Sequence, residues 1–499
     1  MEGRERSGPR RGLAIAACLL SVLIVAPAAD AAAKPKPKRP LVYIFSLDGL
    51  DRDAVADEEK APFLSDLIAD RDGAHGVYFP ASSSVMVAET NPNHSSMITG
   101  AFPETHGIVG NAFATPGAGA DEDSCPASPG GAPVVTTGES PDCLQAETAF
   151  AALERQGSER RYTTALIMGK DKLARLFSSQ DVHPGTYDAD YIWAPCDDPV
   201  PYCDPDVPTN PISGYAADDA LVMDEVIRTT REGIEDGGGA RRPNLTFVNF
   251  PAIDTAGHTF GRTSSAYADA VGAASEQIRR FVDNQKELGT WRRTVMIVVS
   301  DHSMDDTPQL AKVSLRAVLT AGGVSSSDYE IVGNGSAAHI YLTDRDAAGA
   351  PELLARMRAA LTGSPSIDQA LYRVPNPADG GERHTIASAE PSWFLGGVNA
   401  GDIVVSTLPG VAVLEASSVA ALPVNPLQGN HGSTFTRDNF WMIAGGGKLV
   451  RRANSNRAVT NANAAPTALA LLGAKPPADA QASVAKQAFR KKQLRRLSR

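Results

Sequence analysis

Short apolar runs recur along the chain, and each of them ends at glycine, proline or charged residues. Five of these runs have the length of one strand, and they cover residues 41–47, 163–168, 245–250, 294–300 and 440–444. A short continuous apolar run, rich in β-branched residues, predicts a strand that is buried on both faces, as in a parallel sheet.

Segments with helical spacing of apolar residues lie between and after these strands. The clearest is the amphipathic stretch 264–288, and shorter ones are 62–70, 95–99 and 464–472. Strands that alternate with helices favour a largely parallel central sheet with helices on both faces. The sequence therefore predicts an α/β fold of this kind.

Three segments interrupt this alternation. Residues 112–142 are rich in glycine, proline, alanine and serine, residues 195–212 are rich in proline and aspartate, and residues 305–425 mix helix and strand signals. We expect one domain over residues 41–475, with inserted cap lobes at about 112–240 and 305–425. A Pro/Lys linker at 34–40 precedes this domain, and a basic tail at 476–499 follows it.

The first residues are typical of a targeting segment. The arginines Arg4, Arg6, Arg10 and Arg11 precede an apolar run at 13–26, and an alanine-rich stretch follows. The apolar run is shorter than the ~20 residues that a membrane span needs. We predict a signal peptide over residues 1–33 and an exported protein, secreted or held in the cell envelope or periplasm. The Arg10-Arg11 pair leaves a twin-arginine export route open.

The balance of charge is acidic. The formal net charge of −11 becomes −12 once residues 1–33, with four Arg and three acidic residues, are removed. A surface of this sign repels the phosphate backbone, so we expect no nucleic-acid duplex as a partner. The end of the chain, residues 489–499, is strongly basic. It is either a solvated tail or a contact to anionic lipid or envelope polymer.

Four cysteines remain after the predicted signal peptide: Cys125, Cys143, Cys196 and Cys203. An even number in an exported protein favours two disulfides, most simply Cys125–Cys143 and Cys196–Cys203 by proximity. Three connectivities are open from the sequence. A zinc site is the competing interpretation, but no C-x-x-C spacing supports it.

Three aspartates and three histidines lie at loop positions where ligands gather in open α/β sheets. Five of them follow predicted strands closely, and the sixth lies between glycines in the segment 429–432. The six are Asp48, Asp254, His258, Asp301, His302 and His431. One such residue alone is usually a cap or a solvated loop residue. Six together, without cysteine, indicate a site for zinc-like divalent ions.

Thr90 lies just before the predicted short helix at 95–99. A hydroxyl at a helix start can be merely an N-cap, but backbone N–H groups and the helix dipole also favour an incoming anion there. A nearby divalent ion lowers the pKa of such a hydroxyl and makes it a nucleophile near neutral pH. Thr90 is therefore the candidate nucleophile.

Several segments together resemble the nucleotide pyrophosphatase/phosphodiesterase branch of the alkaline phosphatase superfamily. The matching segments are Thr-Asn-Pro-Asn-His at 90–94, Thr-Gly at 99–100, 103–111, 254–258, 300–304, 429–432 and 465–473. They follow one another in the order of the family over residues 40–475. The resemblance implies an alkaline-phosphatase-like α/β fold and a metal-dependent hydrolase of phosphate esters.

The resemblance also implies roles for individual residues. Two zinc ions per chain would be held by Asp254, His258 and His431 on one side, and by Asp48, Asp301, His302 and Thr90 on the other. Asn111 would donate a hydrogen bond to a non-bridging phosphoryl oxygen. Thr90 would attack phosphorus in line, and water would then release the phosphothreonine.

Two features, at three positions, depart from nucleotide-binding members. Asn91 stands where those members often carry an aromatic or large apolar residue on which a base can stack. Lys170 and Lys172 resemble a pair in members that act on phosphate monoesters or on phosphonoacetate, where two cations neutralise a more charged substrate. The lysines can equally be a solvated strand end.

The sequence thus favours an exported phosphodiesterase or pyrophosphatase acting on a small phosphate ester. A phosphomonoesterase or a phosphonoacetate hydrolase is the close alternative. A sulfatase is disfavoured, because that branch has Cys or Ser at the nucleophile position, followed by Pro and Arg. A non-catalytic envelope binding protein that keeps the fold is a remote alternative, since such a protein is expected to have lost ligands.

Overall fold

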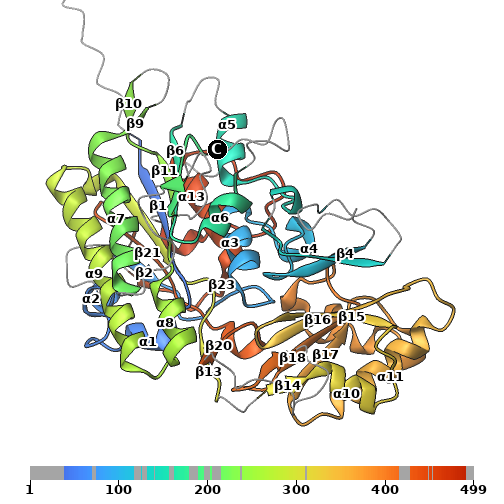
Figure 1. The fold of residues 1–499 in the computed structure, drawn as a ribbon. Coiled ribbons are helices and arrows are strands. Elements are labelled where there is room, and N and C mark those ends of the chain that lie inside the picture. Colours follow the sequence, from blue (N-terminus) through green and yellow to red (C-terminus); the bar gives the residue numbers. More distant parts are fainter. Residues whose placement is uncertain are drawn as a thin grey trace, which may run out of the picture. The chain divides into compact units, whose positions relative to one another are not determined.

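The largest sheet in the described part of the chain has nine strands, in the order β22-β2-β21-β12-β1-β11-β6-β7-β8 (Figure 1). The strands are β1 (Leu41–Leu47), β2 (His75–Tyr78), β6 (Thr164–Met168), β7 (Tyr191–Pro195), β8 (Cys203–Asp204), β11 (Leu245–Phe250), β12 (Thr294–Val299), β21 (Trp441–Gly445) and β22 (Ala453–Asn454). Every neighbouring pair is parallel except those of β21, which runs antiparallel to β12 and β2. The prediction of a largely parallel sheet is confirmed.

The computed structural model describes residues 39–69, 75–116, 125, 132–139, 141–156, 162–178, 189–195, 203–204, 215–235, 239–308, 312–414, 428–447, 449–451 and 453–489. All of them belong to one unit, Arg39–Arg499, as distinct from the unit Met1–Lys38. The predicted signal peptide at 1–33, most of the linker, and residues 490–499 lie outside the described residues. Packed structure reaches Phe489, which is buried, beyond the expected domain end at 475.

One of the two predicted disulfides is present. Cys125 and Cys143 are bonded, with their Cα atoms 4.6 Å apart, and both side chains are buried. Cys196 lies outside the described residues, so the bridge to Cys203 stays a prediction. Among the described helices, none combines the length and apolar character needed to cross a membrane.

The two faces of the central sheet bury different side chains of the same strands. In β1, Val42 and Ile44 belong to one apolar cluster, whereas Tyr43 and Phe45 belong to another. This division follows from the two-residue period of a strand. Each fully buried side chain of this size contributes roughly 1.5–3 kcal/mol to folding. A strand whose two faces are both covered needs apolar residues at consecutive positions, which explains the continuous runs in the sequence.

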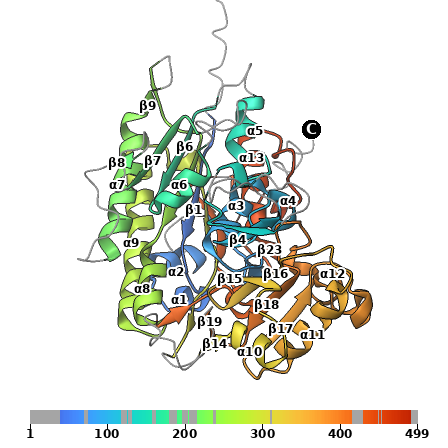
Figure 2. The ribbon, with the colours of Figure 1, turned by 45° about the vertical axis from the view of Figure 1, so that its right-hand side comes forward.

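Helices cover both faces. The first cluster is completed by α3 (Thr90–Thr99), α5 (Ala149–Arg155), α6 (Asp171–Leu176) and α13 (Ala464–Leu472). The second is completed by α1 (Arg52–Ala56), α2 (Pro62–Ala69), α7 (Tyr215–Glu232), α8 (Ala252–Phe260) and α9 (Ser265–Glu287). Figures 1 and 2 show α7, α8 and α9 together along one side of the sheet.

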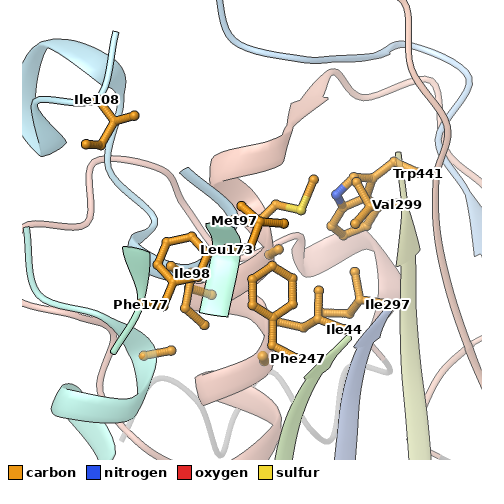
Figure 3. Packing of buried hydrophobic residues seen from close by; sticks show 14 of the residues in the cluster. Ile44, Met97, Ile98, Ile108, Leu173, Phe177, Phe247, Ile297, Val299 and Trp441 are labelled. Carbon is orange, nitrogen blue, oxygen red and sulfur yellow. The ribbon is translucent and has the colours of Figure 1, made fainter. Parts of the chain in front are cut away.

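Figure 3 shows how the first cluster fixes helix α3. Ile44, Phe247 and Ile297 come from three neighbouring strands and pack near Met97 and Ile98 of the helix. All five side chains are fully buried. The packing therefore sets the position of α3, and with it the position of Thr90 at its first turn.

A second sheet lies within the segment expected to form a lobe at 305–425. Its antiparallel strands are β15 (Tyr329–Asn334), β16 (Ala337–Leu342), β18 (Ile403–Thr407) and β17 (Ile367–Tyr372), in that order. Helices α10 (Leu315–Ala321) and α11 (Ala350–Thr362) share an apolar cluster with it. The mixed signals of this segment thus come from a separate small α/β layer. The domain and lobe boundaries themselves stay predictions.

The turn of the β15–β16 hairpin touches the segment that carries His431. The Ser336 N–H donates to the His431 carbonyl oxygen over 2.7 Å. Gly335 has φ +63°, and a Cβ there would lie 2.2 Å from that same oxygen. Glycine is required at this position both for the backbone conformation and for the close approach of the two chain segments.

We expect Gly335→Ala to destabilise the protein more than Gly323→Ala. Gly323 also has a positive φ, +74°, but a Cβ added there would have no neighbouring atom within 4 Å. Gly323→Ala, the control, should lower the free energy of unfolding by about 1 kcal/mol because of backbone strain. Gly335→Ala should lower it by about 1–3 kcal/mol more, because its Cβ overlaps the His431 carbonyl oxygen. Urea unfolding of both variants measures the difference, and equal losses would contradict the proposed contact.

Candidate metal centre and nucleophile

Three neighbouring strands end at one edge of the central sheet, with polar side chains just beyond them. Strands β12, β1 and β11 are adjacent and parallel, so their carboxyl ends meet there. Asp48 follows β1 directly, and Asp301 and His302 come just after β12. Helix α8 begins shortly after β11 and places Asp254 and His258 one turn apart on one face. The sequence prediction had no helix at this position.

His431 reaches this edge from a distant segment. The short strand β20 (Gly429–Asn430) pairs with β13 (Asp305–Asp306), which follows the loop after β12. His431 comes directly after β20, and its ring stacks on that of His302 with centroids 3.7 Å apart. All six predicted ligands therefore lie together, although they come from four separate parts of the chain.

His258, His431 and Asp254 form the first group. The Nε2 atoms of the two rings are 3.0 Å apart, and Asp254 Oδ1 lies 3.4 Å from His258 Nε2 and 3.6 Å from His431 Nε2. The Nδ1 atoms lie 3.0 Å from the carbonyl oxygens of Gly429 and Ala88 and must donate to them. A neutral ring that donates from Nδ1 has a lone pair on Nε2. When both rings are neutral, as metal ligands must be, two lone pairs and a carboxylate oxygen face one another.

Asp48, Asp301 and His302 form the second group. His302 Nε2 lies 3.3 Å from Asp301 Oδ2 and 3.7 Å from Asp48 Oδ1. His302 Nδ1 lies 3.1 Å from the Ser303 carbonyl oxygen, which again leaves the lone pair on Nε2. These three ligand atoms are buried, and within the described residues none has a hydrogen-bond partner.

Both groups have the form of a metal site. In the second group, one ligand atom from each of Asp48, Asp301 and His302 lies within 4.8 Å of the others. Asp254 and His431 of the first group form another such set, with His302 as its third member, and His258 joins them at 3.0–3.4 Å. Buried polar atoms without partners cost free energy unless a cation binds them. The donors are nitrogen and oxygen atoms only, the set that suits zinc-like ions. The residues fit such ions, and their roles as ligands stay predictions.

The protonation of the two buried imidazole rings agrees with this interpretation, whereas the carboxyl groups repel one another in the absence of a divalent ion. Burial lowers the pKa of His302 and brings that of His431 well below its usual range, so both rings are neutral, as ligands must be. Burial together with the carboxylate of Asp48 raises the pKa of Asp301 well above its usual range. Burial opposes ionisation of Asp254 as well, but Lys170 holds its pKa well below the usual range.

Lys170 lies between the two groups. Its Nζ is 2.9 Å from Asp48 Oδ2, 2.8 Å from Asp254 Oδ2 and 3.4 Å from Thr90 Oγ1. Its side chain is only 17% exposed. The interpretation of this lysine as a solvated strand end is therefore wrong. Lys172, on α6, has a pKa lowered by burial and by the charge of Lys170.

Thr90 is the first residue of α3 and is buried, with Lys170 at its hydroxyl. The predicted helix at 95–99 thus begins earlier, at Thr90 itself. Asn111 lies beside it, because its Oδ1 accepts the Asn91 N–H over 2.8 Å. Asn91 is fully buried, and its Nδ2 lies 3.5 Å from the Gly138 carbonyl oxygen. It therefore presents no surface on which a base could stack.

Two residues that the sequence prediction missed support the ligands. Asn249 Nδ2 donates to Asp48 Oδ2 over 3.0 Å and lies 3.2 Å from His94 Nε2. His94 Nδ1 lies 2.9 Å from the Thr90 carbonyl oxygen. A signal was present for Asn249, since it is a polar residue inside the buried apolar strand β11. Both side chains are fully buried, so they fix Asp48 and the first turn of α3.

A pocket of about 490 Å³ opens beside the first group, and we call it the His258 pocket. It is lined by Glu89, Asn111, His258, Gly333, Gly335, Ala412, Val413, Leu414, Asn430 and His431. Glu89 is 4% exposed, and burial raises its pKa to about 7 although the Asn111 N–H, 2.9 Å from Oε2, favours the charged form. The sequence prediction did not include Glu89.

We expect Lys170→Ala to lower the free energy of unfolding by roughly 3–5 kcal/mol in the presence of a chelator, because it leaves Asp48 and Asp254 buried without their cation. Added zinc should restore much of the loss, since a divalent ion supplies the missing charge. Lys172→Ala, which removes no ion pair among the described contacts, is the matched control. Urea unfolding with EDTA and with zinc tests this, and equal stabilities of Lys170→Ala and wild type in EDTA would contradict it.

The comparisons with known proteins agree with this geometry. The chain matches the family model of type I phosphodiesterase / nucleotide pyrophosphatase over residues 42–434. Ectonucleotide pyrophosphatase/phosphodiesterase family member 1 of Rattus norvegicus is 24% identical over 231 residues, 46% of this chain and 20% of the relative. Ectonucleotide pyrophosphatase/phosphodiesterase 1 of Saccharomyces cerevisiae is 24% identical over 284 residues, 54% of this chain and 34% of the relative. The chain thus spans between a fifth and about a third of these relatives.

Solved structures show the fold. Murine ectonucleotide pyrophosphatase/phosphodiesterase 5, in an inactive form in complex with AMP, has a TM-score of 0.60 and 17% identity, with 88% of this chain and 96% of that chain covered. The human protein of the same name gives the same values. The predicted α/β fold is confirmed, since these structures share it. Since the family model covers most of the sequence, the chain belongs to the type I phosphodiesterase/nucleotide pyrophosphatase family.

Proposed function

We propose that this protein is a two-zinc hydrolase of phosphate esters that acts through a phosphothreonine at Thr90. The observation that carries the proposal is the pair of ligand groups, with buried lone pairs facing one another, on either side of Lys170 and Thr90. One ion would be held by Asp254, His258 and His431, and the other by Asp48, Asp301, His302 and Thr90. Two divalent ions supply charge stabilisation to the attacking and the leaving oxygen.

The side chains of the site have separate roles in the proposed reaction. Thr90 Oγ1 attacks phosphorus, a Thr90–phosphate bond forms, and the bond to the leaving oxygen breaks in line with it. Water then cleaves the phosphothreonine and releases phosphate or a monoester. Asn111 is positioned by its bond to the Asn91 N–H and would donate its amide to a non-bridging oxygen. The buried His94 and Asn249 hold Thr90 and Asp48 in place.

We expect Thr90→Ala to lose phosphodiesterase activity by at least ~10³-fold while it still binds metal, because Asp48, Asp301 and His302 remain to hold the second ion. Hydrolysis of bis-p-nitrophenyl phosphate measures the activity, and elemental analysis should find about two zinc ions per chain in both proteins. Chelation should abolish wild-type turnover. An active Thr90→Ala variant would exclude the mechanism, and the absence of bound metal would favour a non-catalytic binding protein instead.

The second candidate is a phosphomonoesterase or phosphonoacetate hydrolase. It is supported by Lys170, which lies 3.4 Å from Thr90 Oγ1 and could neutralise a further substrate charge, and by the nearby Lys172. The burial of Asn91 weighs in the same direction, since it removes a stacking surface for a nucleotide base. The names of the curated relatives favour the nucleotide diester interpretation. We rank the diesterase first and the monoesterase second.

We expect Lys172→Ala to separate these candidates. A monoester carries one more negative charge than a diester, so loss of a cation should reduce kcat/KM for p-nitrophenyl phosphate by roughly tenfold and leave bis-p-nitrophenyl phosphate almost unchanged. Phosphonoacetate is measured alongside. Equal losses on all three substrates would count against a monoester or phosphonate role for Lys172.

The remaining proposals concern the protein's surroundings. The acidic net charge and the N-terminal pattern support export and a small-molecule substrate. Contact of the basic C-terminal end with an anionic envelope is a further proposal that rests on its sequence alone.

A further inference from the structure

Glu89 introduces a negative charge where a phosphate-ester hydrolase must bind an anion. It directly precedes Thr90, is 4% exposed, and lines the His258 pocket. Oε2 accepts the Asn111 N–H over 2.9 Å, and among the described contacts Oε1 makes no hydrogen bond. Burying a carboxylate costs free energy, so such a residue is expected to serve a purpose.

The His258 pocket lies on the leaving-group side of the site under the proposed mechanism. Thr90 attacks from one side of the phosphorus, and in-line displacement sends the leaving oxygen to the opposite side. The first ligand group does not include Thr90, and two of its members, His258 and His431, form the wall of the pocket. The leaving group would therefore extend into this pocket.

The walls of the pocket combine one carboxylate with apolar surface. Strand β19 (Ala412–Leu414) supplies an apolar wall, and Gly333 and Gly335 keep space free because they have no side chains. Among the described residues that line the pocket, Glu89 is the only acidic one, and none is Lys or Arg. Lys172 does not line the pocket, but its positive charge attracts the carboxylate of Glu89. Within the described chain no ion pair joins the two residues.

We propose that the His258 pocket selects the leaving group by charge, and that Glu89 favours phosphate esters of alcohols that carry an ammonium group. An ammonium group with its alkyl chain suits a carboxylate set in apolar walls. A leaving group with its own phosphate or carboxylate meets a like charge there, which costs binding energy. This inference rests on the proposed function, and it disfavours pyrophosphate as the leaving group. Glu89 is thus a specificity-determining residue.

The test compares three methyl aryl phosphates whose leaving phenols differ in charge at the para position. One phenol carries a trimethylammonium group, one a nitro group and one a carboxylate. The same three aryl phosphates without the methyl group serve if the enzyme is a monoesterase. The assays are run at pH 9, well above the usual range of a carboxyl group. Each kcat/KM is divided by the rate constant for hydrolysis of the same ester by hydroxide, which corrects for the different leaving phenols. On this scale, the wild type should act on the ester with the cationic leaving group about tenfold or more faster than on the ester with the anionic one.

Glu89→Gln should bring this ratio close to one, because it removes the charge and keeps the shape. Glu139→Gln is the matched control: Glu139 acts on Lys172 and pairs with Arg175, but it does not line the pocket. The control should keep the wild-type ratio. An unchanged ratio in Glu89→Gln, or an equal loss in both variants, overturns the proposal.

Two further readouts keep the outcome unambiguous. If Glu89→Gln folds poorly, competitive inhibition of the wild type by 4-(trimethylammonio)phenol and by 4-hydroxybenzoate decides the matter, and tighter binding of the anion overturns the proposal. If the wild type hydrolyses none of the esters, the proposed function fails. If it hydrolyses all of them without a preference for the cation, only the role of Glu89 fails.

Discussion

The structure depends on one electrostatic constraint: three buried carboxylates and three imidazoles meet at one edge of a sheet. Such a cluster is stable only where positive charge is supplied to it. Lys170 supplies part of that charge, since its ammonium group contacts both Asp48 and Asp254. The lone pairs of His258 and His431 that face each other still need a cation, which fits a site for divalent ions.

The fold meets this constraint through a few connections. Parallel pairing of β12, β1 and β11 aligns three strand ends, and α8 continues β11 so that two ligands share one helical face. The second sheet contributes through tight contacts with the segment that carries His431, among them the hairpin turn at Gly335 against His431. A rigid scaffold of this kind holds ligand atoms within tenths of an ångström, which a loop alone does not achieve. The same contact forms one wall of the His258 pocket.

Much of the fold could be predicted from the sequence, and the misses have a common cause. The strands 41–47 and 245–250 are found as predicted because both faces are buried, so that their apolar runs are continuous. Helix α8 was missed because Asp254 and His258 replace apolar residues on the face that the site uses. The second sheet was seen only as mixed signals, because helices such as α11 and α12 (Ile386–Ala389) lie between β16, β17 and β18 in the sequence. Asn249 was signalled only by its polar side chain within a buried apolar strand, and Glu89 carries no motif of its own, so that only its contacts reveal it.

The sequence by itself determined which chemical groups are available to the candidate site. The residue types at strand ends, the threonine at a helix start and the order of the family segments supply oxygen and nitrogen donors and a hydroxyl. Only the tertiary structure decided which of these groups meet. It placed Lys170 between two carboxylates, turned the histidine lone pairs toward one another, and set Glu89 in the wall of a pocket. The physical reason is that local periodicity is written along the chain, whereas contacts between distant segments depend on strand order and side-chain direction.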